Sequence, residues 1–263
     1  MKKIALINDL SGFGKCSLAA AIPVISILGI QACPLPTAIL SAQTGFPSYF
    51  YDDYTEKMNC FTDEWAKLQV RFDGIYSGFL GSAAQMHNVL YFLEKFQTKD
   101  TLYLADPVMG DNGERIRIFT QELLDSMKEL TKRASVITPN LTELCLLADT
   151  DYEKLTDHCM SPDYVRYIED TARSLMRKAR GKQTVIVTGI IRRLPGQDYM
   201  GNLAVTPDDA FYLEMPYTGK NFSGTGDLTA SVIAGSMVGG LDAKEALEKA
   251  VRFLRPAIEE ASR

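Results

Sequence analysis

Short apolar stretches and longer amphipathic stretches alternate along the chain. The apolar stretches have the length and the flanking turn residues of buried strands, and the amphipathic ones have the period of helices. The predicted strands cover 3–8, 74–79, 101–105, 135–138 and 184–188, and the predicted helices cover 17–28, 62–71, 83–97, 120–132, 141–149, 162–180, 226–238 and 242–261. Alternation of this kind predicts an α/β fold, a three-layer α/β/α sandwich around a mostly parallel central sheet.

Three segments fit this alternation less well. Residues 30–40 are extended in character but interrupted by prolines, and 199–215 have the pattern of a hairpin. Residues 41–60 are rich in glycine, proline and aromatic residues and are predicted to form a loop over a site. The rings at 46–51 can pack as a small core under this loop, which is the commoner arrangement, or bind a flat heterocycle. No linker interrupts the pattern, so we expect one domain over 1–263.

Polar residues lie at the carboxyl ends of four of the predicted strands. They are Asp9, Asp106, Thr138 with Asn140, and Thr188. The carboxyl ends of parallel strands meet at one edge of a sheet, where open α/β folds carry their ligand crevice. Each of these residues alone can be an ordinary helix cap, but four such positions together favour a site at this edge.

The sequence SGTGD at 223–227 precedes an apolar helix. Two glycines allow a sharp turn and a close approach of the backbone to a ligand, and the amides at a helix N-terminus point toward an anion. Asp227 among these amides can accept a proton from an attacking hydroxyl, and the helix terminus should favour its ionised form at neutral pH. The alternative is a glycine turn in which Asp227 serves as the N-cap.

A second group combines DPVMGD at 106–111 with TPNLTE at 138–143. Asn140 and Glu143 are three residues apart at a helix start, so both can face the same side. Carboxylates and amides beside a phosphate commonly hold magnesium, often through water. The same pair also fits a capping box, and the two roles are compatible.

Composition and charge exclude several classes. The 263 residues carry a net charge of -5, which argues against a nucleic-acid or anionic-membrane surface. The longest apolar run near the N-terminus, 18–30, is interrupted by Pro23 and too short for a membrane span. Five cysteines without a CxxC pair predict a reduced, cytoplasmic protein. The segment GFGKCS at 12–17 matches neither a P-loop nor a dinucleotide-binding turn.

The SGTGD motif resembles the anion hole and catalytic base of ribokinase-like kinases. The segments at 106–111 and 138–143, together with SGFLGS at 77–82, resemble the motifs of pyridoxal/pyridoxamine kinases in the vitamin kinase branch, in order from about residue 3 to 255. The resemblance implies ATP-dependent phosphorylation of the 5′-hydroxymethyl group of a B6 vitamer (pyridoxal, pyridoxamine or pyridoxine). It also implies a homodimer, with no separate lid domain.

The resemblance also implies roles for individual residues. The base would be Asp227, and the anion hole would be formed by Gly224, Thr225 and Gly226. The residues facing ATP would be Asp106, Asn140 and Thr188, and those facing Mg²⁺ would be Asp106, Thr138 and Glu143. A monovalent cation, K⁺ or Na⁺, is a further expectation. The substrate contacts would be Asp9, Thr44 and Phe79.

Two alternatives remain open. Ser41–Thr44 and 9–14 lean toward the hydroxymethylpyrimidine kinases of thiamine synthesis. A non-catalytic vitamin or nucleotide sensor on the same fold is the other, although binding alone would not need Asp227. An ionised Asp9 beside the substrate would favour a cationic amine through a charge-assisted hydrogen bond, so we expect pyridoxamine to be used at least as well as pyridoxal. Alternatively, Asp9 caps the turn that follows its strand and touches no ligand.

Overall fold

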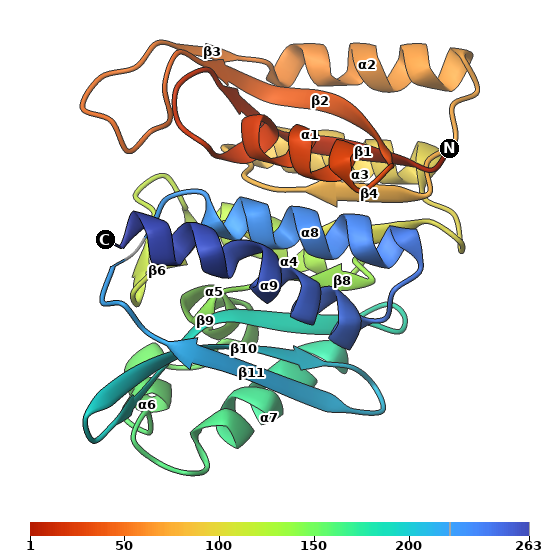
Figure 1. The fold of residues 1–263 in the computed structure, drawn as a ribbon. Helices are drawn as coiled ribbons and strands as arrows, with labels where there is room; N and C mark the ends of the chain where they lie inside the picture. The colour runs from red at the N-terminus through yellow and green to blue at the C-terminus, as the bar shows by residue number, and fades with distance from the viewer. Residues whose placement is uncertain (221, 263) are drawn as a thin grey trace. The chain divides into compact units, whose positions relative to one another are not determined.

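The chain divides into two compact units in the computed structural model (Figure 1). The structure describes residues 1–220 and 222–262. The first unit comprises Met1–Asp106 and Ser223–Asp242, and the second comprises Pro107–Phe222 and Ala243–Arg263.

The first unit is built on the strand order β3-β2-β1-β4-β5. Its elements are β1 (Lys3–Ser11), α1 (Ser17–Ile27), β2 (Gln31–Leu40), β3 (Tyr51–Asp53), α2 (Thr55–Lys67), β4 (Gly74–Ser77), α3 (Ala83–Phe96), β5 (Leu102–Ala105) and α8 (Thr225–Gly239). All neighbouring strands here are parallel except β2 and β3. Helices α1 and α8 pack together on the near side of these strands in Figure 1, and α3 lies on the far side.

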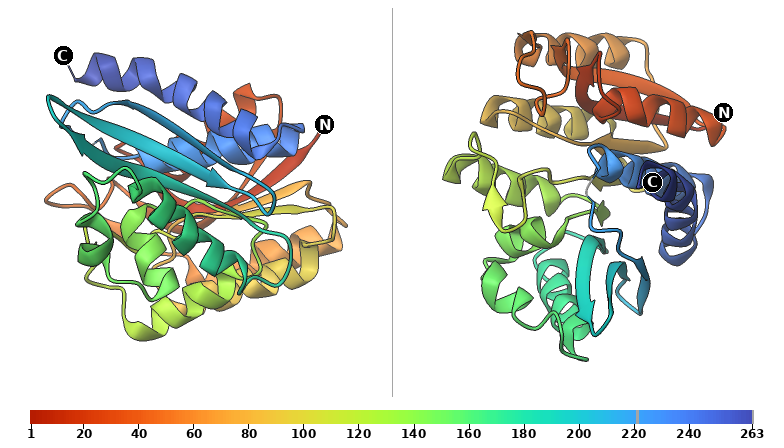
Figure 2. Two further views of the ribbon diagram at one scale, coloured as in Figure 1. Left: turned by 90° about the horizontal axis from the view of Figure 1, so that it is seen from below. Right: turned by 60° about the vertical axis from the view of Figure 1, so that its left-hand side comes forward.

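The second unit has the strand order β8-β9-β10-β11. Its elements are β6 (Gly110–Asp111), β7 (Glu114–Arg115), α4 (Gln121–Thr131), β8 (Val136–Ile137), α5 (Leu141–Ala148), α6 (Tyr152–Thr156), α7 (Tyr164–Met176), β9 (Thr184–Leu194), β10 (Gln197–Val205), β11 (Ala210–Pro216) and α9 (Ala243–Ala261). Strand β8 is parallel to β9, whereas β9, β10 and β11 are antiparallel. Figure 2 shows α7 and α9 on opposite faces of these antiparallel strands.

The core follows the sequence pattern. Strand β4 is buried at every position, as expected of a strand covered on both faces. Helix α7 buries Ile168, Ala172 and Leu175, which repeat at the spacing of one helical face. These observations confirm the predicted α/β fold with a mostly parallel sheet.

Several boundaries differ from the prediction. Helix α2 begins at Thr55 rather than 62, because the Asp53 carboxylate accepts hydrogen bonds from the amide of Thr55 (2.9 Å) and from its hydroxyl (2.5 Å). Strand β2 continues through Pro34 and Pro36, which lie outside the stretch Ala38–Leu40 that pairs with β3. A missing amide is tolerated at both prolines because β3, on the edge of β2 that faces away from β1, does not pair with them.

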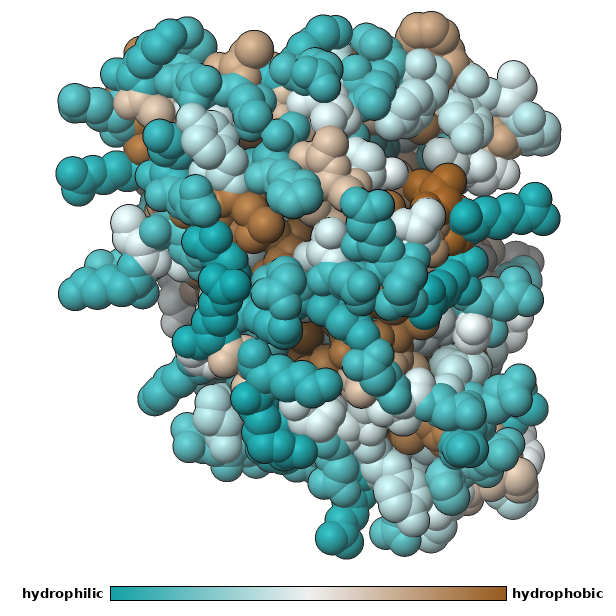
Figure 3. Space-filling view, turned by 180° about the vertical axis from the view of Figure 1, so that it is seen from behind, coloured by the Kyte–Doolittle hydropathy of each residue, from teal (hydrophilic) through white to brown (hydrophobic). Residues whose placement is uncertain are grey.

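Other elements could not be predicted from the pattern of apolar residues because they are short or exposed. Strand β9 continues to Leu194, so the predicted hairpin is a three-stranded antiparallel meander that starts earlier than expected. The β6–β7 hairpin and helix α6 were not predicted. The face opposite to the view of Figure 1 is largely hydrophilic, with separate hydrophobic patches (Figure 3). No helix within 1–220 and 222–262 is long and apolar enough to cross a bilayer.

Candidate active site

The N-terminus of α8 is shaped by one glycine. Gly224 is the N-cap and has a left-handed backbone with φ of 84°. A Cβ atom at this position would lie 1.9 Å from the carbonyl oxygen of Lys15, so the segment before α1 packs directly on the turn. By contrast, a Cβ at Gly226 would meet nothing within 4 Å. The conformational requirement therefore lies at Gly224, and the exposed Gly226 leaves room above the helix terminus.

Asp227 is in the first turn of α8, three residues after the N-cap. The N-cap is Gly224, so the interpretation of Asp227 as the N-cap is wrong. Its carboxylate instead accepts hydrogen bonds from Nδ2 of Asn8 at 3.3 Å and from the backbone amide of Ser17. The amides in the first turn of a helix have no acceptor within the helix. A carboxylate and a helix N-terminus, the feature whose backbone amides bind anions in other proteins, thus share one location.

The protonation of Asp227 is set by competing effects. Its pKa is raised from 3.8 to about 6, chiefly by burial; the amide of Ser17 and the side chain of Asn8 lower the pKa, and the negative charge of Asp9 raises it. The sequence predicted a pKa lowered by the helix terminus, and the direction of that prediction is wrong because burial outweighs the donors. A pKa of about 6 still leaves Asp227 mostly ionised at pH 7, as predicted.

Asp9 lies in β1 with 7% of its surface exposed. Its Oδ2 accepts a hydrogen bond of 2.9 Å from the hydroxyl of Ser11, and its Oδ1 accepts one of 2.6 Å from Ser17. Both carboxylate oxygens therefore already have a partner in the protein. A contact between Asp9 and a substrate stays a prediction and would use a remaining lone pair.

The other predicted substrate contacts lie in more open places. Phe79 is half-buried and its amide donates a hydrogen bond of 3.1 Å to Oδ1 of Asn8. Thr44 is exposed in the segment between β2 and β3. The aromatic rings of this segment are also exposed, including 68% of Phe50, so they do not form a core under the loop. Phe46 contacts Phe13, with ring centroids 5.1 Å apart.

In the second unit, Asn140 is the N-cap of α5. Its side chain accepts from the amide of Glu143 at 3.0 Å, and Oε2 of Glu143 accepts from the amide of Asn140 at 2.8 Å. This confirms the predicted capping box. Two further bonds join it to the segment around 109–110: Met109 N donates to Oε1 of Glu143 (3.1 Å), and Nδ2 of Asn140 donates to the carbonyl of Gly110 (2.8 Å).

Asn140 also forms a parallel β-bridge with Thr188, which lies within β9. The predicted nucleotide-facing residues of the second unit are thus brought together at the capping box. Thr138 is buried two residues before Asn140. In the first unit, Asp106 is 7% exposed and directly follows β5.

The predicted magnesium ligands supply only oxygen atoms, which is the chemistry that magnesium prefers. Both carboxylate oxygens of Glu143 are already bonded to backbone amides. This residue therefore fits contact with a metal through water better than a direct contact. Within 1–220 and 222–262, no group of three or more His, Cys, Asp or Glu side chains is arranged to hold a metal ion.

Two residues in the site were not predicted from the sequence. Asn8 and Ser17 both contact Asp227, and Ser17 also contacts Asp9. A signal for Asn8 was available, since it is a polar residue inside an apolar strand run. Ser17 gave no such signal, because a serine at a helix start is ordinarily a cap.

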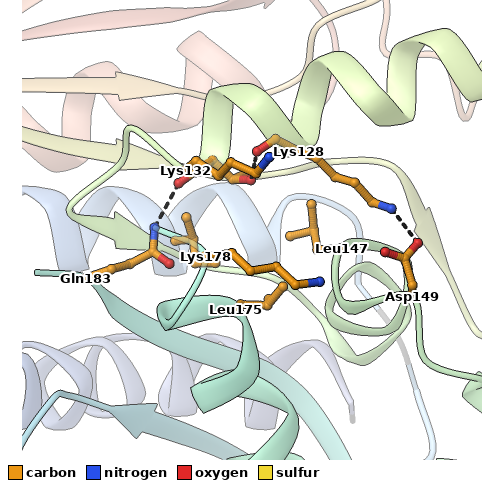
Figure 4. Close-up of a pocket in the computed structure, with 9 residues that line it drawn as sticks. Lys128, Lys132, Leu147, Asp149, Leu175, Lys178 and Gln183 are labelled. Atoms are coloured by element: carbon orange, nitrogen blue, oxygen red, sulfur yellow. Dashed lines mark hydrogen bonds and ion pairs between the residues drawn. The ribbon is translucent and has the colours of Figure 1, made fainter. Parts of the chain in front are cut away.

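A cavity of about 150 Å³ in the second unit is separate from these residues (Figure 4). Lys128, Lys132 and Lys178 contribute to its wall. Lys128 forms an ion pair with Asp149, and the Gln183 side chain donates to the carbonyls of Thr131 and Ala134, each at 2.8 Å. Most polar groups of this wall are therefore engaged with one another, and none of the predicted site residues lines it.

Comparison with solved structures supports the fold. A Bacteroides thetaiotaomicron protein, named for phosphomethylpyrimidine kinase and crystallised with pyridoxal, is 38% identical and has a TM-score of 0.88, covering 98% of this chain and 88% of that one. Pyridoxal kinase from Lactobacillus plantarum is 27% identical with a TM-score of 0.86, covering 99% of this chain and 89% of that one.

Comparison with curated sequences and family models agrees with this. The pyridoxal kinase PdxY of Haemophilus influenzae is 26% identical over 257 residues, which cover 94% of this chain and 85% of that protein. The model of the phosphomethylpyrimidine kinase family matches residues 16–263, which include every motif of the candidate site except Asn8 and Asp9. The chain belongs to the phosphomethylpyrimidine kinase family, as a ribokinase-like α/β protein similar to pyridoxal kinases.

Proposed function

We propose that this protein transfers the γ-phosphoryl group of ATP to the 5′-hydroxymethyl group of a B6 vitamer. One observation carries the proposal: a mostly ionised carboxylate, Asp227, lies in the first turn of a helix whose N-cap is Gly224. A base and an anion-binding terminus at one point are what phosphoryl transfer to an alcohol requires. The names of the relatives, pyridoxal kinases in most cases, favour a B6 vitamer over a hydroxymethylpyrimidine.

The reaction needs little covalent work from the protein, because the transition state of phosphoryl transfer is loose. The Asp227 carboxylate accepts the proton of the substrate hydroxyl as its oxygen bonds to the γ-phosphorus. The bond from that phosphorus to the β–γ bridging oxygen breaks, and ADP leaves. The amides around Gly224, Thr225 and Gly226 stabilise the negative charge of the group being transferred.

The remaining roles follow the resemblance. Asp106, Asn140 and Thr188 would face ATP. Asp106, Thr138 and Glu143 would hold Mg²⁺, which neutralises phosphate charge, and a monovalent K⁺ or Na⁺ ion would assist. The capping box supports this assignment, because it fixes Asn140 and Glu143 rigidly beside the 109–110 segment.

Asp9, Thr44 and Phe79 would face the vitamer, and the exposed aromatic segment between β2 and β3 offers rings for a flat heterocycle. We further propose that residues 1–263 act as one kinase domain without a separate lid domain, in a cytoplasmic homodimer. Light scattering coupled to size-exclusion chromatography tests the dimer.

A turnover screen tests the function. The purified protein with ATP and Mg²⁺ is offered pyridoxal, pyridoxamine, pyridoxine and hydroxymethylpyrimidine in parallel, and ADP and the phosphorylated product are both quantified. Stoichiometric ADP and phosphorylated vitamer are expected. Faster turnover of hydroxymethylpyrimidine would assign the protein to thiamine synthesis, and vitamer binding without turnover would make it a sensor.

A further inference from the structure

Asn8 is a buried amide in β1, with 1% of its surface exposed. Its Oδ1 accepts hydrogen bonds from the amide of Asp9 at 3.0 Å and from the amide of Phe79 at 3.1 Å. With the oxygen occupied by two backbone donors, the amino group has to face the other way. There Nδ2 lies 3.3 Å from Oδ1 of Asp227. The orientation of the side chain is therefore determined by its hydrogen bonds.

Close packing also limits the conformations that the Asn8 side chain can adopt. A Cβ atom at Gly78 would lie 2.2 Å from Nδ2 of Asn8, so the backbone after β4 packs directly against the amide. The side chain thereby joins three segments of the first unit: β1, the turn after β4 and the first turn of α8. A buried polar group held from three sides has one available conformation, which suits it to fix a neighbour in place.

An amide has a particular advantage beside this carboxylate. A lysine in the same place would form an ion pair and make Asp227 a weak base, whereas a neutral donor orients the carboxylate without cancelling its charge. The second donor to Asp227 is the backbone amide of Ser17, which no side-chain substitution removes. Asn8 is thus the side chain through which the base is held.

We propose that Asn8 is a positioning residue for phosphoryl transfer, whose amino group holds the Asp227 carboxylate in one orientation and favours its ionised form. This inference rests on the proposed function, in which Asp227 is the base. Asn8 acts through Asp227, and no contact between Asn8 and the substrate is needed.

The other titratable groups that face Asp227 come from three segments. Asp9 in β1 is negatively charged and raises the pKa of Asp227. Burial raises the pKa of the Cys16 thiol, before α1, and raises the pKa of the Tyr76 phenol, in β4, well above its usual value. Both therefore stay neutral near pH 7, so a change in the pH profile on altering Asn8 reports mainly on Asp227.

Asn8→Asp tests the proposal most selectively. The new carboxylate can still accept from the amides of Asp9 and Phe79, but it cannot donate to Asp227 when ionised. The apparent pKa of the acidic limb of kcat should rise from about 6 by at least roughly one unit, as for carboxylates that share a site. At pH 7, kcat should fall about twofold if the pKa rises by one unit and about tenfold if it rises by two, and it should recover toward pH 9, with little change in the KM for pyridoxal.

The matched control is Asn88→Asp, on α3, where an amide with hydrogen bonds to Thr55 and Asn59 also becomes a carboxylate. This variant should leave the acidic limb unmoved. The proposal would be overturned if the acidic limb of the kcat profile of Asn8→Asp kept the wild-type midpoint while kcat fell equally at pH 7 and pH 9. Asn8 would then only tie β1 to the turn after β4.

A second readout does not depend on activity. The free energy of unfolding is measured from pH 5 to 8 for the wild type, Asn8→Asp, Asp227→Asn and the double variant, in which amide and carboxylate are exchanged. Asn8→Asp should lose stability as the pH rises, and the double variant should regain it while remaining inactive. If the change in the free energy of unfolding of the double variant only equals the sum of the changes in the two single variants, the contact between the two side chains is refuted. Absence of turnover in the wild type would instead reject the proposed function.

Discussion

The hydroxyl of Ser17 donates a hydrogen bond of 2.6 Å to Oδ1 of Asp9. The backbone amide of the same serine donates to Asp227, and its φ of 51° is in the left-handed region that residues with a side chain rarely adopt. Asp9 thus anchors a strained residue whose amide faces Asp227. Backbone strain of this kind persists where the surrounding contacts impose it, and it is found most often at functional sites.

Replacing Asp9 by Ser separates its two possible roles. If Asp9 acts through Ser17, the variant should lower kcat for pyridoxal and pyridoxamine by a similar factor, about three- to thirtyfold, because the base is held less firmly. Steady-state kinetics on both vitamers measure this. A shift of kcat/KM toward pyridoxal by tenfold or more would instead place Asp9 on the amine of the substrate, since a charge-assisted hydrogen bond is worth about 1.5–3 kcal/mol.

The two glycines of the α8 turn should respond differently to the same substitution. Gly224→Ala introduces a methyl group where the carbonyl of Lys15 lies and requires a φ of 84°, so the variant should unfold at a markedly lower temperature. Gly226→Ala enters open space and should keep its Tm within about 2–3 °C of the wild type, apart from a small gain in helix propensity.

The kinetics of Gly226→Ala then report on the anion hole. We expect a fall in kcat with unchanged affinity for the vitamer, because the methyl group would occupy the approach to the transferred phosphate. Calorimetric titration with pyridoxal supplies the affinity. Normal turnover by this variant would show that the glycine is not needed for the approach of the phosphate.

The raised pKa of Asp227 predicts an acidic limb in the pH profile. The ionised form is the base, so kcat should fall about tenfold for each pH unit below about 6 and stay level between pH 7 and 8. Initial rates in overlapping buffers of constant ionic strength test this. A midpoint near 4 would indicate a base in a more solvated environment than the structure gives Asp227.

The same pKa has a consequence for stability. Folding raises the pKa of Asp227, so its contribution to stability is present below about pH 4 and is lost as the pH rises through about 6. Asp227→Asn removes this loss. The variant should be more stable than the wild type by about 1–3 kcal/mol above pH 7, with the difference vanishing toward pH 4. Urea denaturation at pH 4.5 and 7.5 measures the free energy of unfolding of both proteins. A variant that is less stable than the wild type at pH 7.5 would contradict the account.

The capping box supplies a prediction for the second unit. In Glu143→Gln, one of the two acceptor oxygens becomes a donor that faces a backbone amide, so the variant should lose about 1–3 kcal/mol of stability. Its KM for ATP should also rise if the segment at 109–110 faces the nucleotide. Glu122→Gln is the matched control, because it neutralises an exposed carboxylate in the first turn of another helix, α4. Equal KM values for ATP in all three proteins would limit the box to a structural role.

The sequence pattern was sufficient for the parts of the fold that bury continuous apolar runs. Strand β4 is a continuous buried run and helix α7 has a clear helical period, and both lie close to where they were predicted. The β6–β7 hairpin could not be found in this way, because two-residue strands have no period. The start of α2 depended on the side chain of Asp53, which the apolar pattern does not register.

The candidate site shows the same limit. Residues in motifs, such as Asp227 and Asn140, could be identified because glycines or a capping pattern surround them. Asn8 and Ser17 act through contacts with residues more than two hundred positions away along the chain. The direction of the pKa of Asp227 could not be predicted either, since the N-terminus of a helix lowers it and burial, which only the fold reveals, raises it.

The measurement that tests the central claim most directly is the kcat of Asp227→Asn with ATP, Mg²⁺ and pyridoxal at pH 7.5. Circular dichroism and a nucleotide-binding titration on the same sample show whether the variant is folded and binds ATP. The account predicts a folded protein with wild-type affinity for ATP and a kcat lowered by roughly 10²–10⁴, the effect of losing a general base. A folded variant with nearly wild-type kcat would remove Asp227 from the mechanism and contradict the account.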